Sequence, residues 1–168
     1  MTPGAVVWFT GLPSSGKSSL AAAVRTALAR QGIVSATLDG DEFRAALVPS
    51  PAYDEADRSS FYATLANVAA LLAHQGLIVL VPATANRRAY REHARRAAPR
   101  FVEVHVSTPL DECARRDAKG LYGRGPSGQV EHLPGVGAAY EPPLVPEVVA
   151  PNGSDEAAVL CVLGAMGY

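Results

Sequence analysis

The chain has 168 residues, of which 48% are hydrophobic, and this length allows one domain with a substantial core but not two. Its 15 basic and 16 acidic residues are mixed, which excludes a domain-wide positive field for binding nucleic acid or a membrane surface. No apolar run approaches membrane-spanning length and no signal-peptide pattern precedes the first apolar run, so we expect a cytoplasmic protein.

Short apolar runs alternate with segments of helical periodicity along the chain. Four runs predict buried strands and a weaker fifth follows, at Ala5–Thr10, 33–38, 77–81, Phe101–Val106 and 148–149. Helical patterns fill the intervals, and their expected starts and stops are Gly32, Asp54, Gly76, Thr108 with Pro109, and Ser154. This order predicts a single α/β domain over residues 1–168, a parallel sheet between two layers of helices, with ligands at the carboxyl ends of the strands.

A glycine-rich turn joins the first predicted strand to the first helix. Residues 11–18 read G-L-P-S-S-G-K-S and satisfy the P-loop pattern G-x-x-x-x-G-K-[ST]. In such a turn backbone N–H groups surround the phosphates, the lysine bridges the β- and γ-phosphates, and the serine hydroxyl binds Mg²⁺. We therefore predict binding of ATP with Mg²⁺ by Gly11, Ser14, Ser15, Gly16, Lys17, Ser18 and Ser19.

The P-loop alone does not name a reaction. Neither the D-x-x-G switch nor the N-K-x-D base-reading motif of a GTPase follows a predicted strand, and an ATPase machine needs a longer chain. A small-molecule kinase and a non-catalytic nucleotide binder remain.

The second predicted strand ends in the run L-D-G-D-E-F-R, residues 38–44. Asp39, at the strand tip, is a candidate for accepting a hydroxyl proton or holding Mg²⁺, so we count it with Lys17 as catalytic and with Ser18 as a metal ligand. Asp41 either contacts substrate or merely caps the next helix. Arg44, one turn further, either binds an anionic acceptor or lies on the surface.

These motifs together resemble the adenylylsulfate kinase family. The P-loop, the L-D-G-D-E-F-R run, Asp57 with Arg58, a segment R-D-A-K-G-L-Y that ends at Tyr122, and the run Y-E-P-P from Tyr140 follow one another in the family's order. The resemblance implies a P-loop kinase that uses MgATP to phosphorylate the ribose 3′-hydroxyl of adenosine 5′-phosphosulfate, acting as a homodimer.

The resemblance also implies roles for individual residues. Asp39 would be the base or organise Mg²⁺, Arg115 would lie against the ATP adenine, and Lys119 would lie over the bound nucleotide. The acceptor would be held by Asp41, Arg44, Arg58, the ring of Tyr53 and the lid position Leu133.

Several residues on the acceptor side depart from the family's pattern: Phe61, Ala63, Ala85, Asn86 and Leu133. Three readings are therefore open. The chain is an adenylylsulfate kinase with a repacked site, a related kinase for another nucleotide such as cytidine diphosphoramidate, or a nucleotide binder without kinase activity.

Two further segments carry expectations. Residues 119–140 are rich in glycine and proline without periodicity, and we expect them to form a lid over the site. The helix over residues 87–96 carries Arg87, Arg91 and Arg95 on one face, which we interpret as a solvated surface.

Overall fold

A five-stranded, wholly parallel sheet forms the centre of the molecule. The computed structural model describes residues 4–117, 119–123, 132–151 and 153–168. The strands lie in the order β2-β3-β1-β4-β5. Their bounds are β1 Ala5–Thr10, β2 Ser35–Thr37, β3 Ile78–Pro82, β4 Phe101–Val106 and β5 Val148–Ala150.

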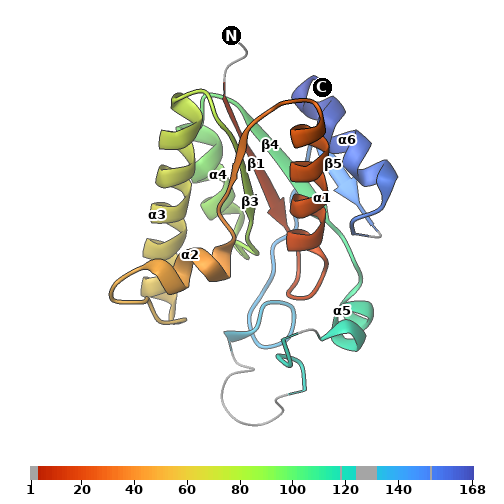
Figure 1. Cartoon of the computed structure of the whole chain (residues 1–168). Coiled ribbons are helices and arrows are strands. Elements are labelled where there is room, and N and C mark those ends of the chain that lie inside the picture. The colour runs from red at the N-terminus through yellow and green to blue at the C-terminus, as the bar shows by residue number, and fades with distance from the viewer. Residues whose placement is uncertain (1–3, 118, 124–131, 152) are drawn as a thin grey trace.

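Helices cover both faces of this sheet, so the predicted three-layer α/β fold is confirmed (Figure 1). The helices α1 and α6 lie on one side, and α3 and α4 lie on the other. The bounds are α1 Lys17–Arg30, α2 Gly40–Ala46, α3 Glu55–His74, α4 Arg88–Ala97, α5 Leu110–Arg116 and α6 Glu156–Met166.

The central strand β1 explains why the core has two halves. All six of its residues are buried. Val7 and Phe9 pack among residues of α1 and α6, whereas Val6 and Trp8 pack among residues of α3 and α4. Alternate side chains of a strand point to opposite faces, so one short apolar run supplies both layers.

The helix termini follow their local sequence. The Asp54 side chain accepts a hydrogen bond from the Asp57 N–H at the start of α3. Gly32 and Gly76, just past α1 and α3, have φ angles of 75° and 93°, a left-handed conformation that glycine adopts without strain.

Two expectations need correction. The second strand spans only Ser35–Thr37 and is half-buried, because it lies at the sheet edge and pairs only with β3. Thr108 does not cap α5; its hydroxyl donates to the Ser15 carbonyl oxygen at 2.8 Å and so anchors the P-loop.

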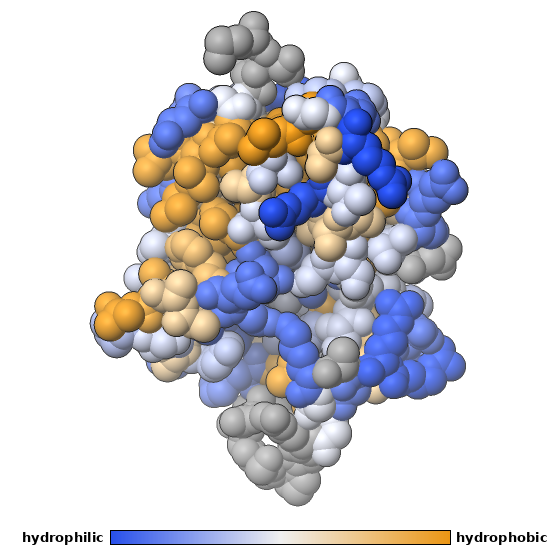
Figure 2. Space-filling view, in the orientation of Figure 1, coloured by the Kyte–Doolittle hydropathy of each residue, from blue (hydrophilic) through white to orange (hydrophobic). Residues whose placement is uncertain are grey.

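The two ends of the sheet differ in character. The carboxyl ends of the strands face α2, α5 and the segment that leads to β5 (Figure 1). Figure 2 shows mainly polar colours over this end, and apolar colours over the far part of α3. Within the part of the chain that the structure describes, no helix is both long and apolar enough to cross a bilayer.

Candidate active site

The P-loop connects β1 to α1 at the carboxyl edge of the sheet. A Cβ atom at Gly11 would collide with the Val106 carbonyl oxygen and the Ser15 hydroxyl, so only glycine allows β1 to leave the sheet here. Gly16 begins α1 with φ 101°, again a conformation that favours glycine. The backbone conformation at these two positions therefore explains why the motif has glycine at each.

Lys17 is folded back onto this loop. Its Nζ atom donates to the carbonyl oxygens of Gly11 and Leu12 at 3.1 and 2.7 Å. Burial, helped by the positive charge of Lys119, lowers the pKa of Lys17 to about 8. The lysine is thus a desolvated cation whose present partners are only neutral carbonyls.

Two serine hydroxyls of the loop lack partners. The Oγ atoms of Ser14 and Ser15 are buried and make no hydrogen bond within the described part of the chain. Buried polar atoms without partners are rare, because each loses its hydrogen bonds to water. Unsatisfied hydroxyl groups beside a buried lysine fit the oxygen atoms of a phosphate chain.

Ser18 and Asp39 meet at the start of the acceptor side. The Ser18 hydroxyl donates to Asp39 Oδ2 at 2.6 Å. Asp39 Oδ1 accepts from the backbone N–H groups of Asp41 and Glu42, so Asp39 is the N-cap of α2. Since Mg²⁺ prefers oxygen ligands, a hydroxyl beside a carboxylate fits that ion, as predicted for this pair.

Asp41 therefore does not cap α2, so the prediction that it is merely a helix cap is wrong. It lies in the first turn of the helix, and its carboxylate forms an ion pair with Lys119. A second contact fixes the same segment, because the Tyr122 hydroxyl donates to the Pro13 carbonyl oxygen at 2.8 Å. Residues 119–123 thus connect α2 with the P-loop.

One large pocket contains both halves of the predicted site. Its volume is about 770 Å³. Among the residues predicted to bind nucleotide, metal or acceptor, those that line it are Ser14, Gly16, Lys17, Ser18, Ser19, Asp39, Asp41, Arg44, Tyr53, Arg58, Lys119 and Leu133. Gly11, Ser15 and Arg115 do not line it.

The sequence prediction missed Arg116. This residue lines the pocket, and its Nη1 atom donates to the Ser15 carbonyl oxygen at 3.3 Å. The side chain of Arg115 is 72% exposed and pairs with Glu112. Arg116 is the first residue of R-D-A-K-G-L-Y, so the correct register of that run would have identified it.

Arg44 lies inside the pocket wall and not on the surface. It is only 7% exposed, and its Nη1 atom donates to the carbonyl oxygens of Pro51 and Ala52 at 3.0 and 2.7 Å. The rings of Phe61 and Tyr53 lie 3.9 and 4.4 Å from its guanidinium carbon. The surface alternative for this residue is therefore wrong.

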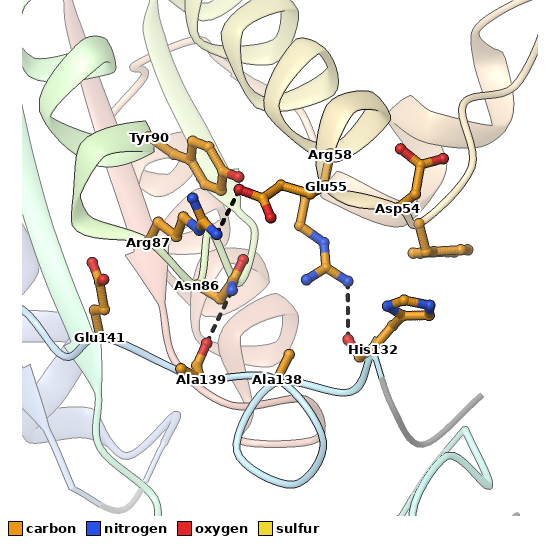
Figure 3. A pocket seen from close by; sticks show the side chains of 11 residues that line it. Asp54, Glu55, Arg58, Asn86, Arg87, Tyr90, His132, Ala138, Ala139 and Glu141 are labelled. Carbon is orange, nitrogen blue, oxygen red and sulfur yellow. Dashed lines mark hydrogen bonds and ion pairs between the residues drawn. The ribbon is translucent and has the colours of Figure 1, made fainter. Parts of the chain in front are cut away.

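Arg58 lines both the large pocket and a second cavity of about 400 Å³, whose lining residues Figure 3 shows. Its Nη2 atom donates to the His132 carbonyl oxygen at 2.9 Å. The second cavity also contacts Asn86, whose Nδ2 atom donates to the Ala139 carbonyl oxygen at 2.9 Å. The Asn86 Oδ1 atom is buried and has no partner among the described residues.

The departures from the family's pattern lie in different places. Phe61 and Leu133 line the large pocket, and Asn86 lines the second cavity. Ala63 and Ala85 line neither of them. Residues 119–123 and 132–140 of the predicted lid border the site, whereas the rest of that prediction falls outside the described residues.

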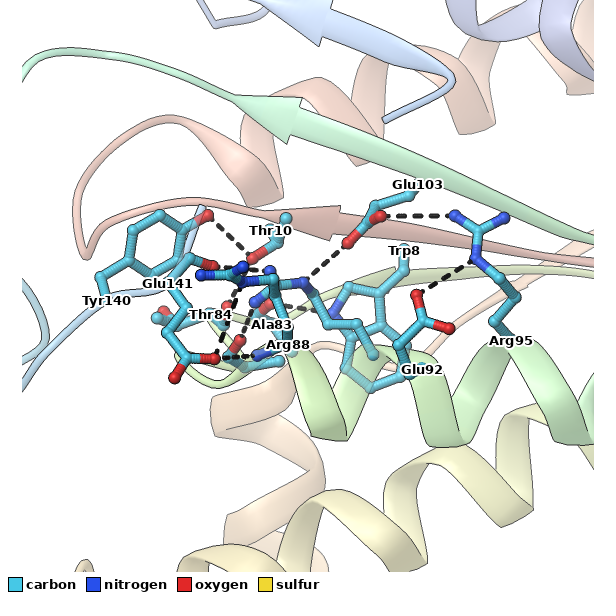
Figure 4. A network of polar contacts seen from close by, with 12 residues as sticks. Trp8, Thr10, Ala83, Thr84, Arg88, Glu92, Arg95, Glu103, Tyr140 and Glu141 are labelled. Carbon is cyan, nitrogen blue, oxygen red and sulfur yellow. Dashed lines mark hydrogen bonds and ion pairs between the residues drawn. The ribbon is translucent and has the colours of Figure 1, made fainter. Parts of the chain in front are cut away.

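The arginine-rich face of α4 is solvated only in part: Arg87 is exposed, as predicted, and Arg95 is partly exposed, whereas Arg91 is buried in a polar network (Figure 4). Arg91 is 1% exposed and pairs with Glu103 of β4 at 2.7 Å. It also donates to the carbonyl oxygens of Ala85 and, at 2.6 Å, Glu141. Arg91 thereby ties the loop after β3 to the segment that leads to β5.

Tyr140, next to Glu141, continues this network. Its hydroxyl lies 3.1 Å from the Thr10 hydroxyl at the end of β1, and Thr10 donates to the Thr84 carbonyl oxygen at 2.6 Å. The walls of the acceptor half are therefore connected to the central strand by side-chain hydrogen bonds.

Comparison with known proteins gives a consistent result. The family model described as adenylylsulphate kinase matches residues 3–151. A curated adenylyl-sulfate kinase of Synechococcus sp. (strain JA-2-3B'a(2-13)) is 41% identical over 146 residues, which cover 87% of this chain and 83% of the relative.

Solved structures agree with the sequence relatives. The APS kinase of Mycobacterium tuberculosis in complex with AMPPNP and APS aligns with a TM-score of 0.92 and 36% identity, covering 100% of both chains. A hexameric APS kinase from Thiobacillus denitrificans aligns with a TM-score of 0.71 and 25% identity, covering 99% of this chain and 29% of that one.

Proposed function

Because this chain belongs to the adenylylsulphate kinase family, an ATP-dependent kinase family, we propose that it transfers the γ-phosphate of ATP to the 3′-hydroxyl of adenosine 5′-phosphosulfate. The observation that carries the proposal is the single 770 Å³ pocket in which the P-loop and the acceptor-side arginines meet. Asp39 lies between these halves, with its carboxylate 2.6 Å from the Ser18 hydroxyl.

On the donor side, the chain supplies positive charge and hydrogen-bond donors. Lys17 exchanges its two carbonyl partners for phosphate oxygens, and Ser14, whose hydroxyl has no partner among the described residues, lines the same pocket. Ser18 and Asp39 would hold Mg²⁺, which supplies neutralisation of the charge that develops during transfer. Arg116 is better placed than Arg115 to lie beside the nucleotide.

On the acceptor side, Arg44 and Arg58 bind the anionic phosphosulfate end, and Tyr53 offers a ring face to the adenine. Asp39 accepts the proton of the attacking hydroxyl. Lys119, held beside the P-loop by Asp41, adds a second cation to the site of transfer. Catalysis then rests on positioning and on electrostatic stabilisation.

The alternatives are less well supported. The curated relative reported above carries the adenylyl-sulfate kinase name, which does not favour a different nucleotide acceptor. A purely nucleotide-binding protein has no need of the buried Arg44 or of Asp39 placed against Ser18. The predicted homodimer stays a prediction, which sedimentation or light scattering tests directly.

Acceptor-dependent release of ADP tests the proposal. The protein is incubated with MgATP and adenylylsulfate, and then with a panel of other nucleotides that includes cytidine diphosphoramidate. We expect rapid ADP release with adenylylsulfate and formation of a 3′-phosphorylated product. Equal or faster release with another nucleotide, or none with any, would overturn the proposal. The exposed-site variant Arg25→Ala serves as a control for changes caused by loss of charge alone.

A further inference from the structure

A buried cation without a carboxylate partner lies in the acceptor half of the large pocket. Arg44 is 7% exposed, and no ion pair joins it to any residue that the structure describes. A charge that leaves water is costly unless hydrogen bonds or other charges compensate it. The molecule therefore keeps an unneutralised cation at a place where an anion can reach it.

Two aromatic rings and two carbonyl groups hold this cation in place. The Phe61 and Tyr53 ring centroids lie 3.9 and 4.4 Å from the guanidinium carbon. The Nη1 atom is occupied by the carbonyl oxygens of Pro51 and Ala52. The Nε and Nη2 atoms make no hydrogen bond to the described part of the chain, so these donors are available to a ligand.

The two rings differ in how firmly they are fixed. Phe61 is 3% exposed, and it packs against Phe43 with centroids 6.1 Å apart and edge-on against Tyr62 at 5.1 Å. Tyr53 is 56% exposed. Phe61 is thus the buried, packed support of the guanidinium, and Tyr53 covers its other side from an exposed position.

We propose that Phe61 is a positioning residue, which holds the Arg44 guanidinium so that its free donors face the anionic phosphosulfate end of the acceptor. The proposal rests on the proposed function and deepens it. From the sequence, Phe61 counted as the loss of an acceptor contact. Its geometry indicates the opposite, because the ring contributes to acceptor binding through Arg44.

The same arrangement constrains Tyr53. One face of its ring is occupied by Arg44, so a base that stacks on Tyr53 uses the other face. The acceptor then binds at two points of one continuous stack, with its base on Tyr53 and its anion on Arg44. Phe61 is the fixed end of that stack.

Kinetics of Phe61→Leu and Phe61→Tyr test the proposal. Leucine keeps an apolar side chain but removes the aromatic face, and we expect the KM for adenylylsulfate to rise about five- to tenfold. The KM for ATP and kcat should change less than about twofold, because Phe61 does not contact the P-loop half. Tyrosine keeps the ring and should restore the wild-type KM. A loss of kcat with an unchanged acceptor KM, or equal effects of both variants, would overturn the proposal.

A double-mutant cycle shows whether the effect passes through Arg44. In an Arg44→Gln background, Phe61→Leu should raise the acceptor KM no further; a second, additive rise would contradict the positioning role. The same cycle is also measured as the urea midpoint of unfolding of the ligand-free protein. If the midpoint shifts of the two single variants simply add in the double variant, the Phe61–Arg44 contact is refuted. The urea midpoint can be measured without turnover. If the wild-type protein fails to use adenylylsulfate, that result refutes only the proposed function, and the stability cycle still tests the contact between Phe61 and Arg44.

Discussion

At the scale of single residues, the site contains side chains that make a structural contact and also face the pocket. Asp39 caps α2 through Oδ1 and accepts the Ser18 hydroxyl through Oδ2. Its cap fixes the carboxylate against the Ser18 hydroxyl. Lys17 is likewise held by the P-loop, through two carbonyl oxygens, and it forms no ion pair with the residues that the structure describes.

Replacing Asp39 by asparagine separates its structural and chemical tasks. Asparagine is also a good N-cap, so α2 should stay formed, while the proton acceptor and the carboxylate are lost. We expect turnover to fall by at least about a hundredfold, with nucleotide affinity changed much less. Steady-state kinetics and calorimetry measure the two effects. Asp39→Ala, which removes the cap as well, should additionally lower the unfolding midpoint; full turnover of Asp39→Asn would exclude Asp39 from the mechanism.

The lowered pKa of Lys17 predicts a pH dependence of nucleotide binding. In the free protein Lys17 is charged below its pKa of about 8 and loses its proton above it. Bound phosphate favours the charged form and raises the pKa, so affinity is full below pH 8 and declines as pH rises further. The Kd for AMPPNP should be about tenfold higher at pH 9 than at pH 7.

Titration calorimetry across this range measures that change. Whatever binding Lys17→Arg retains should show no such decline, because a guanidinium keeps its proton throughout. A wild-type Kd that is flat between pH 7 and 9 would contradict the assignment.

At the scale of elements, α4 acts as a connector between the sheet and the acceptor side. Arg91 reaches Glu103 on β4 and the backbone of both Ala85 and Glu141. Glu103 also contacts Arg95, which pairs with Glu147 before β5. A single helix thus orders one loop after β3 and another before β5.

Removal of this connector should cost stability and acceptor binding together. Arg91→Met leaves Glu103 buried with only the weaker Arg95 contact, and we expect the free energy of unfolding to fall by about 3 kcal/mol. Urea denaturation measures this change. Arg96→Met on the same helix, where the residue is exposed, should change it by less than about 0.5 kcal/mol. Similar losses in the two variants would refute the network's role.

At the scale of the whole molecule, ligands bind where the carboxyl ends of the strands meet, at one end of the sheet. The P-loop, α2 and residues 119–123 border the same pocket and are linked by the Lys119–Asp41 and Tyr122–Pro13 contacts. Binding there should therefore stabilise the whole fold and not one loop.

Thermal unfolding with nucleotide tests this coupling. At an AMPPNP concentration one hundred times its Kd, mass action contributes about 2.7 kcal/mol, which corresponds to a rise in Tm of about 5–10 °C for a domain of this size. The rise should appear as one transition in calorimetry. Lys17→Ala should abolish most of it at the same concentration; two separate transitions, or an unchanged Tm, would argue against a single coupled unit.

The same scale shows what the sequence could predict. The strands, the strand–loop–helix context of the P-loop and most helix ends depend on local periodicity and spacing, and these predictions are confirmed except for the length of β2 and the residues that begin α5 and α6. The role of Arg91 depends on its contact with Glu103, which lies on β4. The sequence pattern of the helix alone cannot show that this strand residue is its partner. The choice between Asp39 and Asp41 as helix cap depends on a shift of two residues in the start of α2, and the Phe61–Arg44 contact depends on the turn that brings α3 against α2.

The second cavity has a consequence for inhibitor design. It shares Tyr53, Arg58 and His132 with the large pocket, so a compound seated in one can extend into the other. Figure 3 shows the Asn86 amide oxygen turned away from Ala139, and this acceptor has no partner among the residues described. An N–H group placed there would gain a hydrogen bond to a buried atom.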